Sequence, residues 1–589
     1  MNKNWLLFLI VLLLLSATAC GSQGDDLPTV TPPSLTPHPP TITVAEVAQS
    51  TDSPDTPEAI VSPTSDTTPA EQPETEAGAD GAAWWNDTVF YEVFVRSFQD
   101  SDGDGVGDIN GLIERLDYLN DGDPETTDDL GVTGIWLMPI MESPSYHGYD
   151  VVDYFKVDEE YGTEEDFQRL IDEAHARDIK VIVDLVMNHT SRDHPWFQES
   201  RDDNSEFRDW YIWRDENPGF RGPEGQTVWH RDGGDYYYGL FWEGMPDLNY
   251  ENPEVTDAMY EAARFWLEDM GVDGFRLDAI KHMVEDGSNQ QNTPATHAWL
   301  EDFYNFYKGI NPDALTVGEA WTGTQQVVDY TGDEVDIAFQ FDLAQDIVSA
   351  SREGIGSLVK DTQAEVVDSF PPGQYATFLT NHDQNRVMSQ MRGDEDAAKV
   401  AASILLTSPG VPFIYYGEEI GMLGEKPDED IRRPMQWTAD SPGAGFSDGQ
   451  PWRPPYDDFP ERNVAAQNDN PGSLLNHYRR LIQLRNGHPA LRGGEWLLVE
   501  ADPGRLYASL RHDEDETLLV LINPGRREVT DYTLALSEGP LPAGVTASLL
   551  FGEGEPVTPE INAAGGFDQY TPLATLPAQS TFIIDLSSP

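Results

Sequence analysis

Eight short apolar runs recur along the chain, and their number and spacing constrain its fold more than any other feature. The runs are rich in β-branched and aromatic residues, and patterns typical of helices, such as those at 164–177 and 255–270, separate several of them. Strands that alternate with helices predict an α/β fold, and eight of them favour a closed (β/α)8 barrel, the TIM barrel, over an open sheet. The runs span residues 89–95, 134–139, 180–184, 274–278, 315–319, 335–339, 375–380 and 411–415.

Two segments depart from the barrel repeat. The stretch from 190 to 249, between the third and fourth runs, is irregular and rich in Trp and Tyr. A connection of that length is usually functional, although at least half of its rings are expected to pack the segment together. After about residue 493 the pattern changes to alternating strands at 505–510, 517–522 and 580–586, which predicts a separate β domain.

The N-terminus has the pattern of an export signal. Lys3 precedes an apolar stretch at 5–15, and small residues at 16–19 come directly before Cys20. The stretch is too short to span a bilayer comfortably, which favours a cleaved signal over a transmembrane helix. Because Cys20 is placed as in a bacterial lipobox, we predict that residues 1–20 are a lipoprotein signal and that Cys20 is lipidated. Ordinary cleavage after Ala19, with free secretion, is the alternative.

Residues 21–83 are mostly Pro, Thr, Ser and acidic residues, and such a composition cannot bury enough apolar surface to fold. They predict a disordered stalk between a membrane and an extracytoplasmic domain. Cys20 is the only cysteine, which excludes disulfides and cysteine metal sites within the chain.

The chain is strongly acidic, with a formal net charge of -70. The stalk holds 11 of the 105 acidic residues and no Lys or Arg, so the folded part keeps a charge near -60. A field of this sign argues against nucleic acid as a partner and against binding to anionic lipid surfaces.

Three acids, Asp278, Glu319 and Asp383, lie at or near the ends of predicted strands within dense polar motifs. The motifs are GFRLDAIKH, TVGEAW and FLTNHDQNR. The C-terminal ends of barrel strands are where an enzyme of this architecture keeps its chemistry. Two carboxyl groups at close range are what glycoside hydrolysis requires, so the three acids predict a hydrolytic site.

A second cluster of acids follows the first predicted strand, in the sequence DSDGDGVGD at 100–108. Acids at positions 1, 3, 5 and 9, Gly at 6 and a backbone carbonyl at 7 repeat the spacing of a calcium-binding EF-hand loop. No Glu stands at position 12, so the EF-hand helices are not expected. The pattern predicts a Ca²⁺ ion, and an acidic turn without metal is the alternative. The predicted ligands are Asp100, Asp102, Asp104, the carbonyl of Val106 and Asp108.

Seven motifs in a fixed order resemble those of the α-amylase family, glycoside hydrolase family 13. They are GVTGIWLMP at 131–139, DLVMNH at 184–189, MPDLN at 245–249, GFRLDAIKH at 274–282, GEAW at 318–321, TNHDQNR at 380–386 and GVPFIYYGEE at 410–419. The resemblance implies a retaining enzyme for α-glucosidic bonds, with a barrel at 84–189 and 250–492. It also implies an inserted domain B at 190–249 after the third strand, and an antiparallel β-sandwich domain C at 493–589.

The resemblance also implies roles for single residues. Asp278 matches the family's nucleophile, Glu319 its general acid/base, and Asp383 its transition-state stabiliser. Asn188 matches a second family calcium site, whose partners in domain B the sequence does not identify. Arg276, two residues before Asp278 and on the same face of the strand, is expected to keep that nucleophile ionised. The predicted substrate-binding residues are Tyr146, Tyr149, His189, Arg276, Lys281, His282, His382 and Arg386.

Several positions bear on specificity. MPDLN resembles an intermediate subfamily between oligo-1,6-glucosidases and neopullulanases, and Lys281 with His282 matches the pair that holds glucose units on the leaving-group side in α-amylases. Exo-acting relatives carry an Asp where this chain has Tyr146. These features favour cleavage of internal α-1,4 bonds in starch or maltooligosaccharides by a monomer. An α-glucosidase, oligo-1,6-glucosidase or transglycosylase is the alternative, supported by RRPMQW at 432–437, and a non-catalytic carbohydrate-binding lipoprotein is the alternative from another class.

Overall fold

The computed structural model describes residues 83–124 and 126–587. The predicted signal, Cys20 and almost all of the predicted stalk lie outside the described residues. Within the described ranges, no helix combines the length and the apolar character that crossing a bilayer demands.

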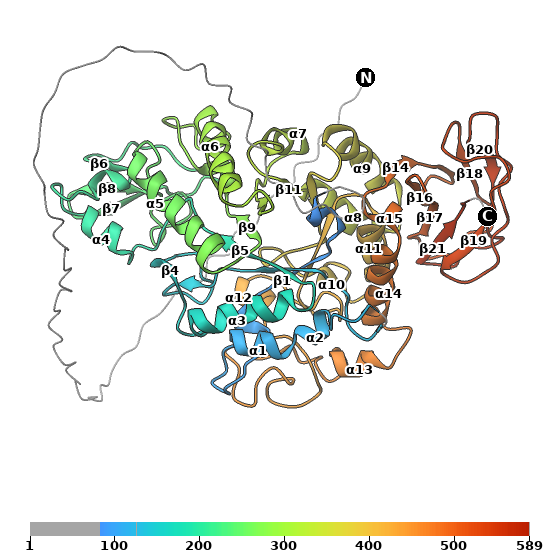
Figure 1. Ribbon diagram of the computed structural model, residues 1–589, viewed down its shortest axis with the longest axis horizontal. Coiled ribbons are helices and arrows are strands. Elements are labelled where there is room, and N and C mark those ends of the chain that lie inside the picture. The colour runs from blue at the N-terminus through green and yellow to red at the C-terminus, as the bar shows by residue number, and fades with distance from the viewer. Residues whose placement is uncertain (1–82, 125, 588–589) are drawn as a thin grey trace, which may run out of the picture. The chain divides into compact units, whose positions relative to one another are not determined.

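The eight predicted strands close into a parallel barrel in the order β1-β13-β12-β11-β10-β9-β5-β2 (Figure 1). The ring closes because β1 pairs with its sequence neighbour β2 on one side and with the last barrel strand, β13, on the other. The predicted fold class is therefore confirmed. The strands are β1 Phe90–Val93, β2 Gly134–Leu137, β5 Lys180–Leu185, β9 Gly274–Leu277, β10 Leu315–Gly318, β11 Ile337–Phe339, β12 Tyr375–Thr377 and β13 Val411–Tyr415.

Alternation along the strands fills the barrel. In β1, Phe90 points into the interior cluster while Tyr91 packs into the larger core shared with the helices. Phe90 stacks on Phe413 with ring centroids 4.5 Å apart. A Cβ at Gly134, opposite Phe90, would lie 2.6 Å from that ring, so the interior requires glycine there. Both faces of each strand are buried, which explains why the strands are continuous apolar runs.

Helices surround the barrel, and several of the longer ones begin at a residue whose side chain caps the helix. In α3 the Thr163 and Asp166 side chains form a reciprocal capping box. The pattern at 255–270 becomes α5 followed by a short π-helical segment, Phe265–Asp269. The helices are α1 Ile109–Glu114, α2 Leu116–Leu119, α3 Glu164–His175, α5 Pro253–Arg264, α6 Pro294–Ile310, α7 Thr324–Val327, α8 Phe341–Glu353, α9 Ser357–Ser369, α10 Val387–Gln390, α11 Glu395–Thr407, α12 Asp428–Ile431, α13 Val464–Asn468, α14 Leu474–Gly487 and α15 Pro489–Arg492.

The irregular segment after the third barrel strand forms a small subdomain with α4 Pro195–Ser200 and a three-stranded antiparallel sheet. Its strands are β6 Trp213–Arg214, β8 Asp235–Tyr238 and β7 Trp229–Asp232, in that order across the sheet (Figure 1). Phe197 packs against Tyr211, Trp213 and Tyr237 with centroid distances of 4.9–5.5 Å. Many rings in this segment therefore stabilise the segment itself.

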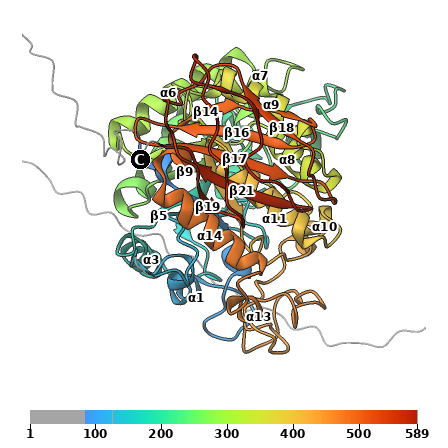
Figure 2. The ribbon, with the colours of Figure 1, turned by 90° about the vertical axis from the view of Figure 1, so that its right-hand side faces the viewer.

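The C-terminal region consists of two antiparallel sheets. The larger has the order β14-β16-β17-β21-β19 and the smaller the order β15-β18-β20, and Figure 2 shows them on the side that faces the viewer. All seven residues of β17 are buried: Leu519 and Leu521 join the core between the two sheets, and Val520 joins the barrel core. This confirms the predicted sandwich. The strands are β14 Glu495–Leu498, β15 Glu500–Asp502, β16 Tyr507–His512, β17 Thr517–Asn523, β18 Thr533–Leu536, β19 Ser548–Phe551, β20 Phe567–Tyr570 and β21 Ser580–Asp585.

Candidate active site

The three predicted acids lie at the C-terminal ends of barrel strands. Asp278 directly follows β9 and Glu319 directly follows β10. Asp383 stands further along, because β12 ends at Thr377 and an irregular segment carries the chain onward. Asp278 and Glu319 are both in contact with Arg276, so the barrel brings together residues 41 positions apart in the chain, from 278 to 319.

Arg276 is the centre of the charge network. Its Nη1 lies 2.5 Å from Asp278 Oδ1 and 3.1 Å from Asp184 Oδ1, and its Nη2 lies 3.0 Å from Glu319 Oε2. Strand register explains this convergence, because Asp184 of β5 is the direct neighbour of Arg276 and Asp278 is two residues further along the same face. The buried guanidinium thus holds three carboxyl groups at one point.

Glu319 has the environment of a proton donor. Burial raises its pKa, and the charges of Asp278 and Asp383 add to the effect, which Arg276 partly opposes. Its Oε2 accepts from the backbone N–H of Ala279 at 3.1 Å and forms an ion pair with Arg276 Nη2 at 3.0 Å. Ala279 has a left-handed backbone, φ 50°, which turns the chain directly after the nucleophile position. Because Oε2 already faces a donor and a cation, the proton of the neutral acid belongs on Oε1.

Asp383 has the opposite environment. Burial favours its neutral form, but the charges of His382 and Arg432 outweigh this and lower the pKa of Asp383 far below its usual range. Arg432 Nη2 donates to Asp383 Oδ1 at 2.9 Å, and His382 Nε2 lies 3.2 Å from Asp383 Oδ2. Asp383 is therefore ionised near neutral pH.

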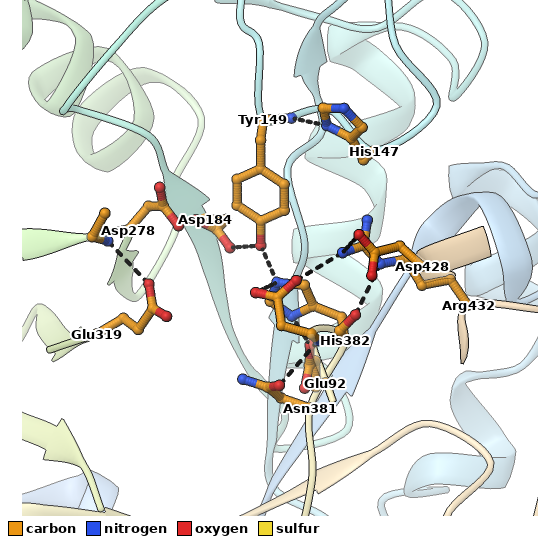
Figure 3. A network of polar contacts seen from close by, with 12 residues as sticks. Glu92, His147, Tyr149, Asp184, Asp278, Glu319, Asn381, His382, Asp428 and Arg432 are labelled. Atoms are coloured by element: carbon orange, nitrogen blue, oxygen red, sulfur yellow. Dashed lines mark hydrogen bonds and ion pairs between the residues drawn. The ribbon is translucent and has the colours of Figure 1, made fainter. Parts of the chain in front are cut away.

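Tyr149 lies between Asp278 and Glu319 on one side and His382 and Arg432 on the other (Figure 3). Its hydroxyl donates to Asp184 Oδ2 at 3.0 Å and lies 2.7 Å from His382 Nε2. Its ring stacks on the His382 ring at 5.4 Å. His189 Nε2 lies 3.1 Å from the Tyr149 carbonyl oxygen, and burial lowers the pKa of His189 to about 4, so a neutral imidazole donates to that carbonyl near pH 7.

Comparison with known proteins agrees with this geometry. A family described as "Alpha amylase, catalytic domain" matches residues 92–494. The chain belongs to the α-amylase family. It is therefore an enzyme of glycoside hydrolase family 13.

The relatives carry several names. Alpha-amylase 3 of Dictyoglomus thermophilum is 41% identical over 461 residues, which cover 76% of this chain and 86% of that protein. Trehalose synthase/amylase TreS of Mycobacterium tuberculosis is 36% identical over 75% of this chain and 82% of its own length. An oligo-1,6-glucosidase of Parageobacillus thermoglucosidasius is 35% identical, with 75% and 90% covered. The crystal structure of an alpha-amylase from H. orenii superposes with a TM-score of 0.74 at 42% identity, covering 85% of this chain and 99% of that one.

The other predicted substrate-binding residues lie outside the Arg276 charge network, and each makes different contacts. Lys281 Nζ donates to the Trp321 carbonyl oxygen at 2.6 Å, and His282 Nδ1 lies 2.6 Å from the Gln290 carbonyl oxygen. Tyr146 stacks on Trp452 at 5.4 Å. Arg386 is buried and donates to the carbonyl oxygens of Ile431 and Tyr416, at 2.8 and 2.6 Å. Its contacts are those of a structural residue and do not fit the predicted substrate contact.

Three residues of the site were not singled out from the sequence. Asp184 opens the DLVMNH motif, Glu92 is a lone acid inside the first apolar run, and Arg432 opens RRPMQW. An acid within a continuous apolar run is a usable signal, because burial of a carboxylate is costly without a partner. The partners of Glu92 and Arg432 lie far away in the sequence, and only the fold identifies them.

The loop at 100–108 keeps part of the predicted metal geometry. One carboxylate oxygen from each of Asp100, Asp102 and Asp108 lies within 4.8 Å of the others. Asp104 is outside this group, and its Oδ1 accepts from the backbone N–H of Val106 at 2.8 Å. Gly105 has φ +97°, and a Cβ there would lie 2.1 Å from the Gln450 carbonyl oxygen, so the loop requires glycine. Three converging carboxylates form the oxygen donor set that Ca²⁺ prefers.

Asn188 lies at the junction of the barrel and the inserted subdomain. Its Nδ2 is 3.2 Å from Asp247 Oδ2, in the MPDLN motif, and 3.3 Å from His189 Nδ1. Asp247 is the neighbour that the sequence did not identify. Burial raises the pKa of Asp247 to about 7, a shift that a bound cation would reverse.

Proposed function

We propose that this enzyme is a retaining α-glucan hydrolase that cleaves internal α-1,4-glucosidic bonds of starch and maltooligosaccharides. The observation that supports it most is the pairing of Asp278 and Glu319 through Arg276. In this mechanism the Asp278 carboxylate attacks the anomeric carbon while Glu319 Oε1 gives its proton to the leaving oxygen. Water then hydrolyses the glycosyl-enzyme as Glu319 takes the proton back.

The other residues have supporting roles in this proposal. Tyr149 offers its ring as a platform for the reacting sugar, and ionised Asp383 binds ring hydroxyls and favours the oxocarbenium-like ring. Arg276 holds the nucleophile in place through its 2.5 Å contact with Asp278 Oδ1.

The aromatic side chains around the site support cleavage within chains. Tyr146 pairs with Trp452 as two neighbouring rings, and neither side chain supplies a charged clamp for a chain end. Phe241 is 42% exposed and lies 5.1 Å from the His189 ring, and Trp321 is 47% exposed. Exposed aromatic rings of this kind are suited to stacking on successive glucose units.

The cleavage pattern tests this proposal. We expect early maltotriose and longer products from starch, and hydrolysis of maltoheptaose whose non-reducing end is blocked. Tyr146→Asp introduces the charge that exo-acting relatives carry and should shift products toward glucose, whereas Tyr146→Phe keeps the ring and should leave the pattern unchanged. Chromatography of the products over time gives the answer.

Glucose as the sole early product, with blocked maltoheptaose left intact, would instead establish an α-glucosidase or oligo-1,6-glucosidase. The names of the relatives keep that second candidate open. A disaccharide formed by glucosyl transfer would indicate a transglycosylase. If the wild-type protein bound these sugars but released no reducing ends, it would be the non-catalytic carbohydrate-binding lipoprotein.

We also propose that the loop at 100–108 binds Ca²⁺ and stabilises the fold without taking part in the reaction. Excess EDTA should then lower the melting temperature, because an ion that binds only the folded state adds its binding free energy to stability. Asp102→Asn should melt at the lower temperature with or without EDTA, while Asp286→Asn, at an exposed position, should respond like the wild type. An EDTA-insensitive melting curve, with no metal detected by elemental analysis, excludes this site.

We also propose that the N-terminus anchors the enzyme to a membrane. A lipidated Cys20 would hold the enzyme at a membrane surface, with residues 21–83 as a spacer. Cys20→Ser should move the protein from the membrane fraction to the soluble fraction, and a wild type found free in the medium would favour secretion.

A further inference from the structure

Glu92 is a buried acid behind the site to which the proposed reaction assigns no role. It belongs to β1, its exposed fraction is 2%, and its Oε1 lies 2.6 Å from His382 Nδ1. The other ring nitrogen of His382, Nε2, lies 3.2 Å from Asp383 Oδ2. The imidazole thus lies between the carboxyl groups of Glu92 and Asp383. Figure 3 shows Glu92 beside His382.

This arrangement decides the protonation of His382. The contact with Glu92 Oε1 requires a proton on Nδ1. Nε2 lies 2.7 Å from the Tyr149 hydroxyl oxygen and 3.2 Å from Asp383 Oδ2. The Tyr149 hydroxyl donates its one proton to Asp184, so a neutral ring would turn the lone pair of Nε2 toward two acceptors, whereas the imidazolium donates there as well as to Glu92. Burial lowers the pKa of His382, but the charges of Asp383 and Glu92 outweigh it and raise the pKa to about 9.

Other charged groups also face His382. Arg432 donates from Nε to the His382 carbonyl oxygen at 3.0 Å and from Nη2 to Asp383. Asp184 is reached through the Tyr149 hydroxyl, which accepts from Nε2–H of the imidazolium. The Trp136 ring packs edge-on against the imidazole at 5.6 Å, and the Arg276 guanidinium lies 5.3 Å from the same ring. Of the carboxylates in this list, Glu92 contacts Nδ1, so it alone is placed to set the tautomer.

We propose that Glu92 is a positioning residue, whose carboxylate fixes His382 as an imidazolium so that the positive charge of the ring, with Nε2 3.2 Å from Asp383 Oδ2, holds Asp383 in the orientation that binds the sugar. The inference rests on the proposed role of Asp383. A carboxylate that accepts from one ring nitrogen of a histidine fixes the tautomer and the orientation of the ring, and this decides whether the other nitrogen donates or accepts.

Glu92→Gln tests this with two measurements. Gln keeps an acceptor for Nδ1–H but removes the charge. The first measurement uses protein labelled with ¹⁵N at histidine, in which the His382 signal is identified because it is missing in His382→Asn. We expect the midpoint of the His382 titration to fall by at least about one pH unit. At pH 7 we expect kcat on maltoheptaose to fall about 10- to 100-fold, the range for carboxylates that orient functional histidines. KM should change far less, because the reacting ring depends on Asp383 most strongly in the transition state.

Glu418→Gln is the matched control. Glu418 is equally buried, at 3%, but accepts from the Tyr478 hydroxyl at 2.7 Å and does not contact His382, so both measurements should stay at wild-type values. In a His382→Asn background, Glu92→Gln should cause no further loss of kcat. If Glu92→Gln fails to fold, Glu92→Asp keeps the charge, and the titration midpoint should stay above that of free histidine while kcat falls.

An unchanged His382 titration in Glu92→Gln, or an equal loss of kcat in Glu418→Gln, would overturn the role of Glu92. The titration is read without substrate. A failure of the proposed endo-hydrolysis would therefore show in the product pattern while leaving the titration result intact.

Discussion

Asp278→Asn is expected to lower starch hydrolysis by about 10⁴-fold or more, the scale seen when a covalent nucleophile is removed. The Asn side chain keeps the shape and can still accept from Arg276 Nη1, which lies 2.5 Å from Asp278 Oδ1, but it cannot form the glycosyl-enzyme. Binding of maltoheptaose should persist, because the aromatic and hydroxyl contacts remain. Reducing-sugar assays and calorimetric titration measure the two quantities separately.

Asp286→Asn is the control for this experiment. It makes the same chemical change at an exposed position eight residues further along, and its activity should match the wild type. Hydrolysis by Asp278→Asn at a rate near that of the wild type would contradict the assignment of the nucleophile.

Arg276→Met is expected to cause the largest loss of stability. The guanidinium is fully buried and contacts Asp184, Asp278 and Glu319, so its removal leaves buried carboxylates without compensation. Breaking a buried charge network in this way costs about 3–5 kcal/mol. The loss should be greatest near neutral pH and shrink as the pH falls, because protonated carboxyls no longer require the cation.

Melting curves at several pH values measure this effect. Arg169→Met is the matched control, because Arg169 pairs with Asp166 at 3.2 Å on the surface of α3, where such a pair contributes about 1 kcal/mol or less. Equal melting temperatures for the wild type and Arg276→Met would show that the network is not needed for stability.

Much of the barrel was predictable because its strands are buried on both faces. A continuous apolar run is a strong signal: seven of the eight predicted runs contain an observed barrel strand, and the run at 180–184 falls one residue short of β5. The boundaries were less accurate: the run at 375–380 ends as a strand at Thr377, because the chain then leaves the barrel to place His382 and Asp383. The helical pattern at 255–270 did not reveal its π-helical end, since one extra residue in a turn barely changes the spacing of apolar residues.

In the loop at 100–108, the spacing of the acids does not by itself predict which carboxylates converge. Asp100, Asp102 and Asp108 converge as their positions predict. Asp104 has the predicted spacing as well, but its carboxylate lies outside this group. Asp100, Asp102 and Asp104 all accept backbone hydrogen bonds within the loop, so the backbone path of the turn, which spacing does not give, decides which carboxylates converge.

The sequence alone determined the fold class, a separate C-terminal β domain and the pairing of Arg276 with Asp278, because strand periodicity and burial are local properties. The tertiary structure alone decided that Arg276 also reaches Asp184 and Glu319, that Glu92 supports His382 across 290 positions, and that Arg432 holds Asp383. Those contacts depend on the register in which distant strands pair and on the closure of the barrel. Each neighbour is chosen by the packing of the whole chain, so no local pattern encodes it.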